Sequence, residues 1–516
     1  MSPGALLVRA EASAQIGWGH VMRCLALAHT WQDRGGTSIF AMVHPLSVLE
    51  SRLRSEHVSV AVIDARPGSI EDAGQLADLA RKNDARWIVV DGYQFGVDYQ
   101  RVLKNAGHRV LAVDDYACIG THVADIVLDQ NAGASENLYA NTALGSKLLL
   151  GSRYAVLRRE FKRWRNWKRE TPPTAKKMLI TMGGSDPQNL TLRAIQTLNS
   201  IHAEGIEAIV VVGSNNPHIQ ELNELARNAR HRIQIETDPL NMAELMAWAD
   251  VAISSAGSTC WEMCMMGLPA IIIEVAENQR PIAQELNARG ICLRIPLAEA
   301  NSGNIAAKLE PLLSSMERRK QMSSGGQKLI DGHGAERLIA AMRIQEFTLR
   351  RASFGDSRLL WQWANDPLVR QASFSPGPIS WHEHEEWFAQ KISDPSCLLL
   401  IFEDATGPVA VVRTDANGRA DAEISITIAP GYRGHGLASA LLDRSLETIF
   451  NTTSAERVHA FIKPTNLPSS RSFANAGFIL LGSSRVRGCD ALHYLRERQQ
   501  KSGSEYREHD REVVPC

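Results

Sequence analysis

The alternation of apolar and polar residues over the first two thirds of the chain predicts buried strands that alternate with helices. Residues 5–10 form a short apolar run bounded by polar residues, which is typical of a buried strand. Apolar residues then recur at helical spacing from Val21 to Ala28, so we expect a helix to begin near His20. The loop between the two contains Gly17 and Gly19. A strand, a glycine loop and a helix start in succession present backbone N–H groups to a phosphate.

His20 stands at the mouth of this predicted helix. The positive end of the helix dipole favours the neutral imidazole, which is a proton acceptor near neutral pH. His20 is therefore a candidate general base. A glycine turn followed by a histidine that only caps the helix explains the same pattern, and the spacing alone leaves both interpretations open.

Two further apolar runs, residues 87–91 and 109–115, are predicted strands that end in carboxylates. Ligands of open α/β sheets lie at the carboxyl ends of the strands. Asp91, Tyr93 and the pair Asp114–Asp115 are therefore candidate site residues, with exposed turn residues as the alternative.

Residues 158–177 are rich in arginine and lysine around Pro172 and Pro173. We interpret them as a polar connector between two lobes, with a solvated face and no binding role.

A second α/β unit follows the connector. The apolar run at residues 178–182 leads into Gly183 and Gly184, and the run at 251–254 leads into a loop of small residues. In that loop Ser258 and Thr259 can offer hydroxyl and N–H groups to phosphate.

Glu262 lies one turn into the next predicted helix, where it can accept hydrogen bonds from a ribose diol. Two such lobes facing each other would bind a nucleotide with a sugar attached.

Four motifs in this order resemble the UDP-2,4-diacetamido-2,4,6-trideoxy-β-L-altropyranose hydrolases of pseudaminic acid biosynthesis, relatives of the two-lobed GT-B glycosyltransferases. The motifs are Gly17-Trp18-Gly19-His20-Val21-Met22-Arg23-Cys24, Gly183-Gly184-Ser185-Asp186, Ala256-Gly257-Ser258-Thr259-Cys260-Trp261-Glu262 and Glu277-Asn278-Gln279. The resemblance covers roughly residues 5–340.

This resemblance implies that His20 is the catalytic base, that Tyr93 and Asn278 lie in the sugar site, and that segment 256–262 holds UDP. Further substrate-binding residues that it implies are Gly17, Gly19, Arg23, Asp91, Gly183, Gly184, Ser258, Thr259, Glu262 and Gln279. The implied reaction is attack of water on the anomeric carbon with inversion and departure of UDP, without a metal.

The chain changes character near residue 346. The alternating run 422–428 is typical of a half-buried strand, and it leads into Arg433, two glycines and a helical stripe. Such glycines expose N–H groups at a helix start, and Arg433 adds charge, so the segment suits a diphosphate. Gly431 occupies the outer position of the motif, where glutamine is usual. A plain strand-turn-helix junction is the alternative.

Together with residues 460–466 and 470–478, this motif resembles the GNAT N-acetyltransferases over roughly residues 346–497. The resemblance implies acetyl-CoA as co-substrate. The residues that it places at acetyl-CoA are Ile426, Ile428, Arg433, Gly434, His435, Gly436, Leu437, Ala438 and Asn466. Phe473 stands where the family commonly has a tyrosine that protonates the thiolate. Glu423 is a candidate base for the amine, or an ordinary strand residue.

Composition narrows the class of protein. The 516 residues suggest about three domains, and with a formal net charge of -1 no nucleic-acid or membrane partner is expected. The eight cysteines show no zinc-type spacing, and the first residues lack the basic region followed by an apolar run that is typical of an export signal. We therefore expect a cytoplasmic protein. The predicted domains are residues 1–157 and 158–345 (two Rossmann-type, GT-B-like lobes), 346–500 (an α+β GNAT domain) and 501–516 (a disordered tail).

The sequence thus predicts a bifunctional enzyme that acetylates the 4-amino group of a UDP-amino-sugar and hydrolyses the UDP-diacetamido sugar. A GT-B glycosyltransferase with an accessory acetyltransferase and a nucleotide-sugar- and CoA-binding regulatory protein are the alternatives. The stereochemistry of the sugar and the oligomeric state stay open.

Overall fold

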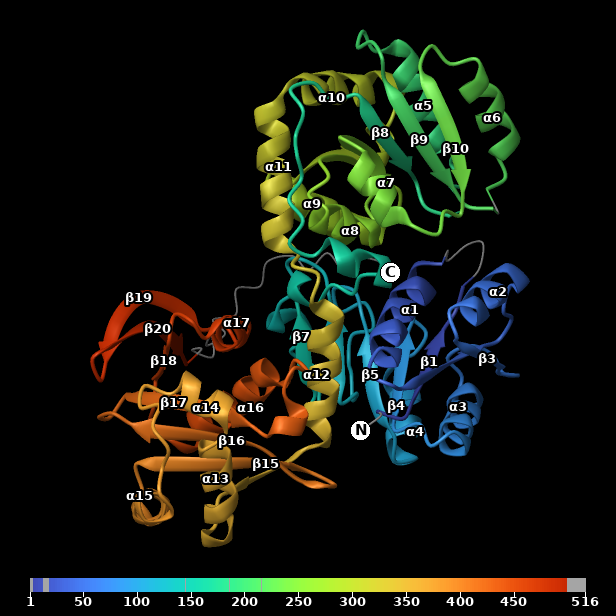
Figure 1. Ribbon diagram of the computed structural model, residues 1–516. Helices are drawn as coiled ribbons and strands as arrows, with labels where there is room; N and C mark the ends of the chain where they lie inside the picture. The colour runs from blue at the N-terminus through green and yellow to red at the C-terminus, as the bar shows by residue number, and fades with distance from the viewer. Residues whose placement is uncertain (1–2, 13–17, 144, 185, 215, 499–516) are drawn as a thin grey trace, which may run out of the picture. The chain divides into compact units, whose positions relative to one another are not determined.

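The computed structural model describes residues 3–12, 18–143, 145–184, 186–214 and 216–498 (Figure 1). The chain divides into two units, of which the first ends at Ala335 and the second begins at Glu336. The division lies before most of helix α12 (Gly334–Glu346), whereas we expected a boundary after it. Ala340 and Ile344 of this helix belong to the hydrophobic core of the second unit, which explains the earlier division.

The first unit opens with a seven-stranded sheet whose paired strands are all parallel. Its order is β3 (Ser59–Val62), β2 (Thr37–Met42), β1 (Ala5–Ala10), β4 (Trp87–Asp91), β5 (Arg109–Val113), β6 (Ile126–Asp129) and β7 (Lys147–Leu150). Its helices are α1 (Gly19–Gln32), α2 (Ser47–Ser55), α3 (Ile70–Lys82) and α4 (Val97–Asn105), with short 3-10 turns η1 (Glu136–Tyr139) and η2 (Ser152–Tyr154). After β1 the chain continues to β2 on one side of that strand, and it later returns to form β4 on the other side of β1. A ligand crevice is expected outside such a switch point.

A second parallel sheet of six strands completes this unit. Its order is β10 (Arg232–Thr237), β9 (Glu207–Val212), β8 (Lys177–Thr181), β11 (Val251–Ser255), β12 (Ala270–Glu274) and β13 (Cys292–Pro296). Its helices are α5 (Leu190–Ser200), α6 (Ile219–Arg227), α7 (Met242–Trp248), α8 (Thr259–Met265), α9 (Arg280–Ala288), α10 (Ser302–Ser314) and α11 (Met316–Leu329), with turns η4 (Glu277–Gln279) and η5 (Leu297–Glu299). The switch point here lies between β8 and β11.

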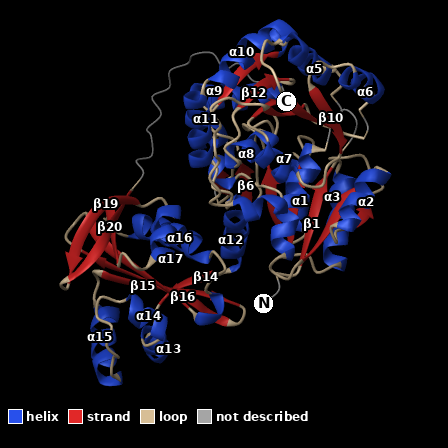
Figure 2. Cartoon of the chain, turned by 45° about the horizontal axis from the view of Figure 1, so that its top comes forward, coloured by secondary structure: helices blue, strands red, loops and turns tan. Residues whose placement is uncertain are grey.

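Strands β1, β4, β11 and β12 are buried over their whole length, as parallel strands covered by helices on two faces must be. Helix α1 lies against β1, and Figure 2 shows it beside that strand. It begins at Gly19, so the predicted helix start near His20 is confirmed.

The connector between the lobes contains the turn η3 (Arg159–Trp164). Arg158 lies mostly buried, and Arg169 donates hydrogen bonds to the carbonyl oxygens of Met246, Ala249 and Met266. The interpretation of this segment as a solvated face is therefore wrong for these two arginines. They satisfy buried acceptors that charge counting along the sequence does not reveal.

The second unit contains a mixed seven-stranded sheet with helices on both faces. Its order is β14 (Thr348–Arg351), β15 (Cys397–Asp404), β16 (Gly407–Ala416), β17 (Asp421–Ile428), β18 (Arg457–Ile462), β20 (Cys489–Glu497) and β19 (Ile479–Val486). Besides α12, its helices are α13 (Ser357–Ala364), α14 (Pro367–Ala372), α15 (Trp381–Ser393), α16 (Leu437–Thr452) and α17 (Leu467–Asn475), with turns η6 (Phe354–Asp356) and η7 (Pro430–Tyr432). Helices α13 and α15 pack on one face and α16 on the other (Figure 1). Two Rossmann-type lobes followed by an α+β domain confirm the predicted fold class.

In the part of the chain that the structure describes, no helix combines the length and the apolarity that crossing a membrane requires.

Candidate functional site

The first candidate site lies at the switch point of the first sheet. Strands β1 and β4 run in parallel register, with Ala10 opposite Asp91, so the loop after β1 and the end of β4 meet at one edge. His20 stands in the first turn of α1, beyond that loop. Gly17 lies outside the described residues, and Gly19 opens the helix.

Asp91 orients the imidazole of His20. The Nδ1 atom of His20 lies 2.6 Å from Asp91 Oδ1. Burial opposes ionisation of Asp91, but the charges of Arg23 and His20 outweigh it and hold the pKa of this carboxyl well below its usual range. The proton of the contact therefore belongs to Nδ1, which leaves Nε2 as the acceptor nitrogen. The side chain of His20 is 14% exposed, whereas that of Asp91 is fully buried.

Arg23 lies between two carboxylates. Its Nε and Nη2 donate to Asp91 at 2.6 and 2.7 Å, and its Nη1 donates to both oxygens of Asp115 at 3.0 and 3.1 Å. Burial raises the pKa of Asp115, but Arg23 outweighs that effect and lowers it. Asn131, which follows β6, donates to Asp115 Oδ1 at 2.8 Å. The geometry assigns Arg23 to the positioning of Asp91, a role its motif did not indicate.

Sequence reasoning missed Asn131, although its place just after a strand end is the signal that could have identified it. Asp114 points elsewhere: its Oδ2 accepts from His122 Nε2 at 2.8 Å, and both side chains are fully buried. It is a structural residue in this geometry.

Tyr93 and Asn278 link the two lobes of the first unit. Asn278 Nδ2 donates to the Tyr93 hydroxyl at 3.1 Å, and that hydroxyl lies 3.4 Å from Asp115 Oδ2. Burial and the charge of Asp115 raise the pKa of Tyr93 to about 12, so the phenol keeps its proton at neutral pH. The Tyr93 ring stands edge-on to His20, with centroids 5.5 Å apart. The structure thus places His20, Tyr93 and Asn278 together.

The second lobe presents glycines at its own switch point. Gly183, with φ of +91°, and Gly184 follow β8. A Cβ on Gly213, after β9, would lie 2.1 Å from the carbonyl oxygen of Gly184, so the two loops meet through glycine backbone alone. Gln279 accepts from the Val275 N–H at 3.2 Å and shapes the loop that carries Asn278.

Ser258 and Thr259 stand at the start of α8, after the neighbouring strand β11, with Ser258 exposed. Glu262, one turn later, forms a two-pronged pair with Arg158: Nε to Oε1 at 2.7 Å and Nη2 to Oε2 at 2.9 Å. The pair uses two of the roughly four lone-pair positions of the carboxylate. Arg158 is a partner that sequence reasoning missed. Among the described residues, no group of three or more His, Cys, Asp or Glu side chains is arranged to hold a metal ion.

The second candidate site lies in the second unit, before α16. Gly434 and Gly436 have φ of +77° and +70°, a backbone that favours glycine, and His435 stands between them. Leu437 anchors the helix start in the core, and Ala438 follows it.

The guanidinium of Arg433 contacts protein groups in this loop. Its Nε donates to the Ile428 carbonyl at 2.9 Å and its Nη1 to Asp366 Oδ1 at 2.8 Å. Asp366 therefore occupies Nη1, while Nη2 is buried without a hydrogen-bond partner among the described residues.

Strands β17 and β18 separate beside this loop. They pair in parallel over residues 421–423 and 457–459, while β17 keeps its pairing with β16 as far as Ile428. Ile426 and Ile428 pack toward the core on the α16 face, so their backbone groups, not their side chains, can face a ligand between the strands.

Two residues at α17 take structural roles. Asn466 caps the helix by accepting from the Ser469 N–H at 3.3 Å. Phe473 is buried and packs edge-on against Phe478, with ring centroids 4.9 Å apart. A residue at position 473 therefore contributes to the core in this structure.

Glu423 is half-buried at the point where β17 and β18 separate, opposite His459. His459 belongs to a chain of polar groups: its Nε2 lies 2.9 Å from Asp421 Oδ1, and its Nδ1 lies 2.9 Å from His493 Nε2. Sequence reasoning missed this chain because its members come from three strands.

Comparisons with known proteins support both halves of this description. Residues 346–479 match the acetyltransferase (GNAT) domain, and residues 178–338 match the glycosyltransferase family 28 C-terminal domain. The UDP-2,4-diacetamido-2,4,6-trideoxy-beta-L-altropyranose hydrolase of Campylobacter jejuni is 29% identical over 287 residues, which are 55% of this chain and 97% of that protein. The sequence resemblances to that hydrolase family and to GNAT acetyltransferases are thus confirmed.

Two further comparisons differ in how much of the chain they cover. An uncharacterized protein of Methanocaldococcus jannaschii is 22% identical over 481 residues, 91% of this chain and 95% of that protein, so the similarity extends over both units. The match to the crystal structure of Acinetobacter baumannii MurG covers 66% of this chain and 99% of the MurG chain, with 16% identity and a TM-score of 0.49. The chain is a glycosyltransferase-like nucleotide-sugar enzyme joined to a C-terminal GNAT acetyltransferase domain.

Proposed function

We propose that this chain is a bifunctional nucleotide-sugar enzyme. Its first unit hydrolyses UDP-2,4-diacetamido-2,4,6-trideoxy-β-L-altropyranose to the free sugar and UDP. Its second unit transfers an acetyl group from acetyl-CoA to the 4-amino group of the UDP-amino-sugar precursor.

The contact between His20 and Asp91 carries the hydrolase proposal. With Nδ1–H bound to Asp91 at 2.6 Å, the free Nε2 can take a proton from water, and the Asp91 charge stabilises the imidazolium that forms. The water oxygen attacks the anomeric carbon, the bond from that carbon to the UDP oxygen breaks, and UDP leaves with the electron pair. The 29% identity to the Campylobacter hydrolase, over 287 residues, supports this assignment.

The loops at the second switch point supply the leaving-group contacts in this proposal. Gly183 and Gly184 expose backbone, and Ser258 and Thr259 add hydroxyls to the N–H groups at the start of α8. Such donors stabilise the charge that develops on a departing diphosphate. Tyr93 and Asn278, joined at 3.1 Å, would contact the sugar between these loops and His20.

In the acetyltransferase reaction the amine nitrogen attacks the thioester carbonyl carbon, the C–N bond forms and the C–S bond breaks. The amine loses one proton, for which Glu423 is the proposed acceptor, and the CoA thiolate gains one. The separated strands β17 and β18 and the glycine loop before α16 would hold acetyl-CoA, in keeping with the match to the GNAT model.

The hydrolase proposal is tested by measuring UDP release from the diacetamido substrate with wild type and His20→Ala, and with His44→Ala as the control at an exposed histidine. We expect His20→Ala to lose activity by at least about 100-fold and His44→Ala to keep it. Undiminished release by His20→Ala would exclude this residue as the base. Replacement of Gly434 and Gly436 by alanine should abolish thiol release from acetyl-CoA, because their backbone angles do not suit a side chain. Tight CoA binding by wild type without thiol release would instead favour a regulatory protein.

Glycosyl transfer is a second candidate, favoured by the match of residues 178–338 to a glycosyltransferase domain. Mass analysis of the products separates the two. Free sugar supports hydrolysis, and sugar attached to an acceptor supports transfer.

A further inference from the structure

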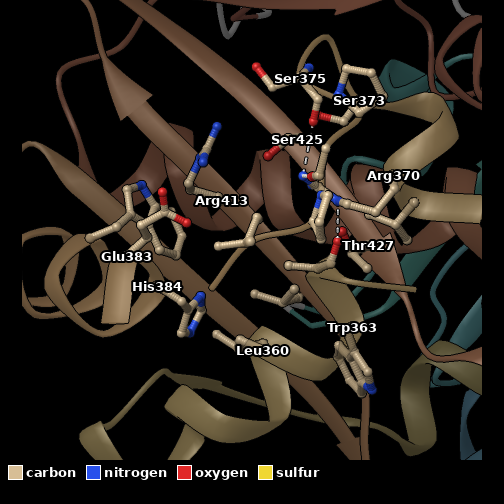
Figure 3. Close-up of a pocket in the computed structure, with 18 of the residues that line it drawn as sticks. Leu360, Trp363, Arg370, Ser373, Ser375, Glu383, His384, Arg413, Ser425 and Thr427 are labelled. Carbon is tan, nitrogen blue, oxygen red and sulfur yellow. Dashed lines mark hydrogen bonds between the residues drawn. The ribbon is translucent and has the colours of Figure 1, made fainter. Parts of the chain in front are cut away.

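The second unit contains a cavity of about 630 Å³ on the face of the sheet that α13 and α15 cover (Figure 3). This volume lies within the range of small-molecule sites. Leu360, Trp363 and Trp387 from these two helices form an apolar wall, and Ser425 and Thr427 of β17 line the opposite side.

The cavity is electropositive. Arg370, Arg413 and Arg487 line it, and Glu383 is the one carboxylate among its lining residues. Glu383 is engaged elsewhere, because it accepts hydrogen bonds from the backbone N–H and the hydroxyl of Ser380 in a capping box at the start of α15.

The neighbouring groups leave this positive charge in place. Arg370 donates to the backbone carbonyls of Ala364, Ser375 and Gly377, which carry no counter-charge. His384 donates from Nε2 to the Ser357 carbonyl, and burial lowers its pKa, which favours the neutral ring, so it adds no charge.

Arg413 is the cation on the sheet itself. It stands opposite Ser425 in the register of β16 and β17, and its guanidinium lies 5.7 Å from the centroid of the Trp387 ring. Asp415 pairs with Arg413 at 2.9 Å but also with Lys391 at 2.7 Å, so one carboxylate is shared by two cations. In Figure 3 Arg413, Ser425 and Thr427 lie around the same space.

The cavity also adjoins the separation of β17 and β18. Ser425 and Thr427 follow Glu423 on the same face of β17, because side chains two residues apart on a strand point to one side. These residues lie in the part of β17 beyond its pairing with β18, where the proposed function places acetyl-CoA. A molecule in the cavity would thus lie beside the thioester.

We propose that this cavity is the acceptor site of the acetyltransferase, and that it selects a sugar amine still linked to a nucleoside diphosphate, with Arg413 contacting the diphosphate. The inference rests on the proposed function and adds the site and the recognition element. The positive lining matches the diphosphate and disfavours cationic acceptors such as polyamines, while the tryptophans suit the apolar faces of a sugar or a base. The amine nitrogen forms its bond to the acetyl carbon as the C–S bond breaks, with its proton lost to a base and one proton gained by the CoA thiolate.

The test compares two acceptors with the full chain: a UDP-linked 4-amino sugar and the same amino sugar without UDP, each with acetyl-CoA and with thiol release as the readout. We expect Arg413→Gln to lower kcat/KM about 10- to 150-fold for the UDP-linked amine, mainly through KM. It should change kcat/KM less than about threefold for the free amino sugar and leave the KM for acetyl-CoA unchanged. Arg413→Lys should restore part of the loss, and Arg485→Gln, at an exposed arginine of the β19–β20 hairpin, should match wild type.

A second measurement needs no variant: UDP should inhibit wild-type acetyl transfer competitively against the UDP-linked amine and not against acetyl-CoA. Equal losses on both acceptors, no loss in Arg413→Gln, or no competition by UDP would overturn the assignment of the cavity while leaving acetylation of UDP-amino sugars intact. Wild type that acetylates a polyamine or the free sugar but not the UDP-linked amine would overturn the proposed function as well.

Discussion

Replacement of Asp91 by asparagine is the sharpest perturbation of the proposed hydrolase site. The amide side chain would keep the shape of the carboxylate and lose its charge. Only one of its two polar atoms is an acceptor, yet Arg23 and His20 both donate to Asp91 in the structure. Asp91 Oδ1 accepts from both His20 Nδ1 and Arg23 Nη2, and Oδ2 accepts from Arg23 Nε. With the amide oxygen at the place of Oδ2, the amide NH₂ faces Nδ1 of His20. The ring proton then moves to Nε2, which removes the base.

The magnitude follows from the charge that Asp91 provides to the imidazolium. Two unit charges about 4 Å apart interact by about 4 kcal/mol at an effective dielectric constant of about 20. Arg23 neutralises part of the carboxylate, so we take about 2–4 kcal/mol, which corresponds to a loss of kcat of about 30- to 1000-fold. Because Arg23 keeps its bonds to Asp115, the fold should persist.

The assay is UDP release under saturating diacetamido substrate, with thermal unfolding measured alongside. Asp98→Asn is the matched control, since Asp98 forms an exposed pair with Arg101 on α4. A kcat for Asp91→Asn within about threefold of wild type, in a protein that unfolds at the usual temperature, would refute the view that Asp91 sets the protonation of His20.

Three further predictions concern the rest of the chain. Burial, with a neighbouring arginine, lowers the pKa of His29 to about 4, so the unfolded chain binds its proton first as the pH falls. The free energy of unfolding of the wild type should be about 2–3 kcal/mol lower at about pH 4.5 than above about pH 6.5. Denaturant unfolding of His29→Gln should lack this part of the pH dependence. Glu262→Gln should lower the free energy of unfolding by about 2 kcal/mol, because it weakens the mostly buried pair with Arg158. The Tm should fall, and an unchanged Tm would contradict this. Glu423→Gln should lower kcat for acetyl transfer about 100-fold without changing the KM for acetyl-CoA. If Glu423→Gln keeps its kcat and His459→Gln loses activity, the proton of the amine goes to the chain of polar groups around His459 instead.

Exposed residues of the same types serve as controls for these three variants. His44→Gln, Glu224→Gln and Glu386→Gln should leave stability and both activities within error of wild type. An equal pH dependence of unfolding in wild type and His29→Gln would contradict the role of His29.

The pattern of the sequence identifies the elements that carry the candidate sites. Apolar runs such as residues 87–90 predict buried parallel strands, and the structure confirms them, because a strand covered on both faces has no polar side. Glycines that precede apolar residues at helical spacing indicate the loops at Gly19 and Gly436, because the backbone there must turn and begin a helix. The boundary between the two units is harder to predict from the sequence, because the residues of α12 show helical spacing whichever core the helix joins.

What the tertiary structure alone decided is which of these loops meet. Arg23 finds Asp91 and Asp115 at separations of 68 and 92 residues, and Asn278 finds Tyr93 across 185 residues. Periodicity tells which side of an element is buried, but not that β4 pairs with β1 after two intervening strands, because that order depends on packing among all the elements. The cavity around Arg413 arises in the same way, from side chains of helices, strands and a hairpin that come together only when the sheet forms.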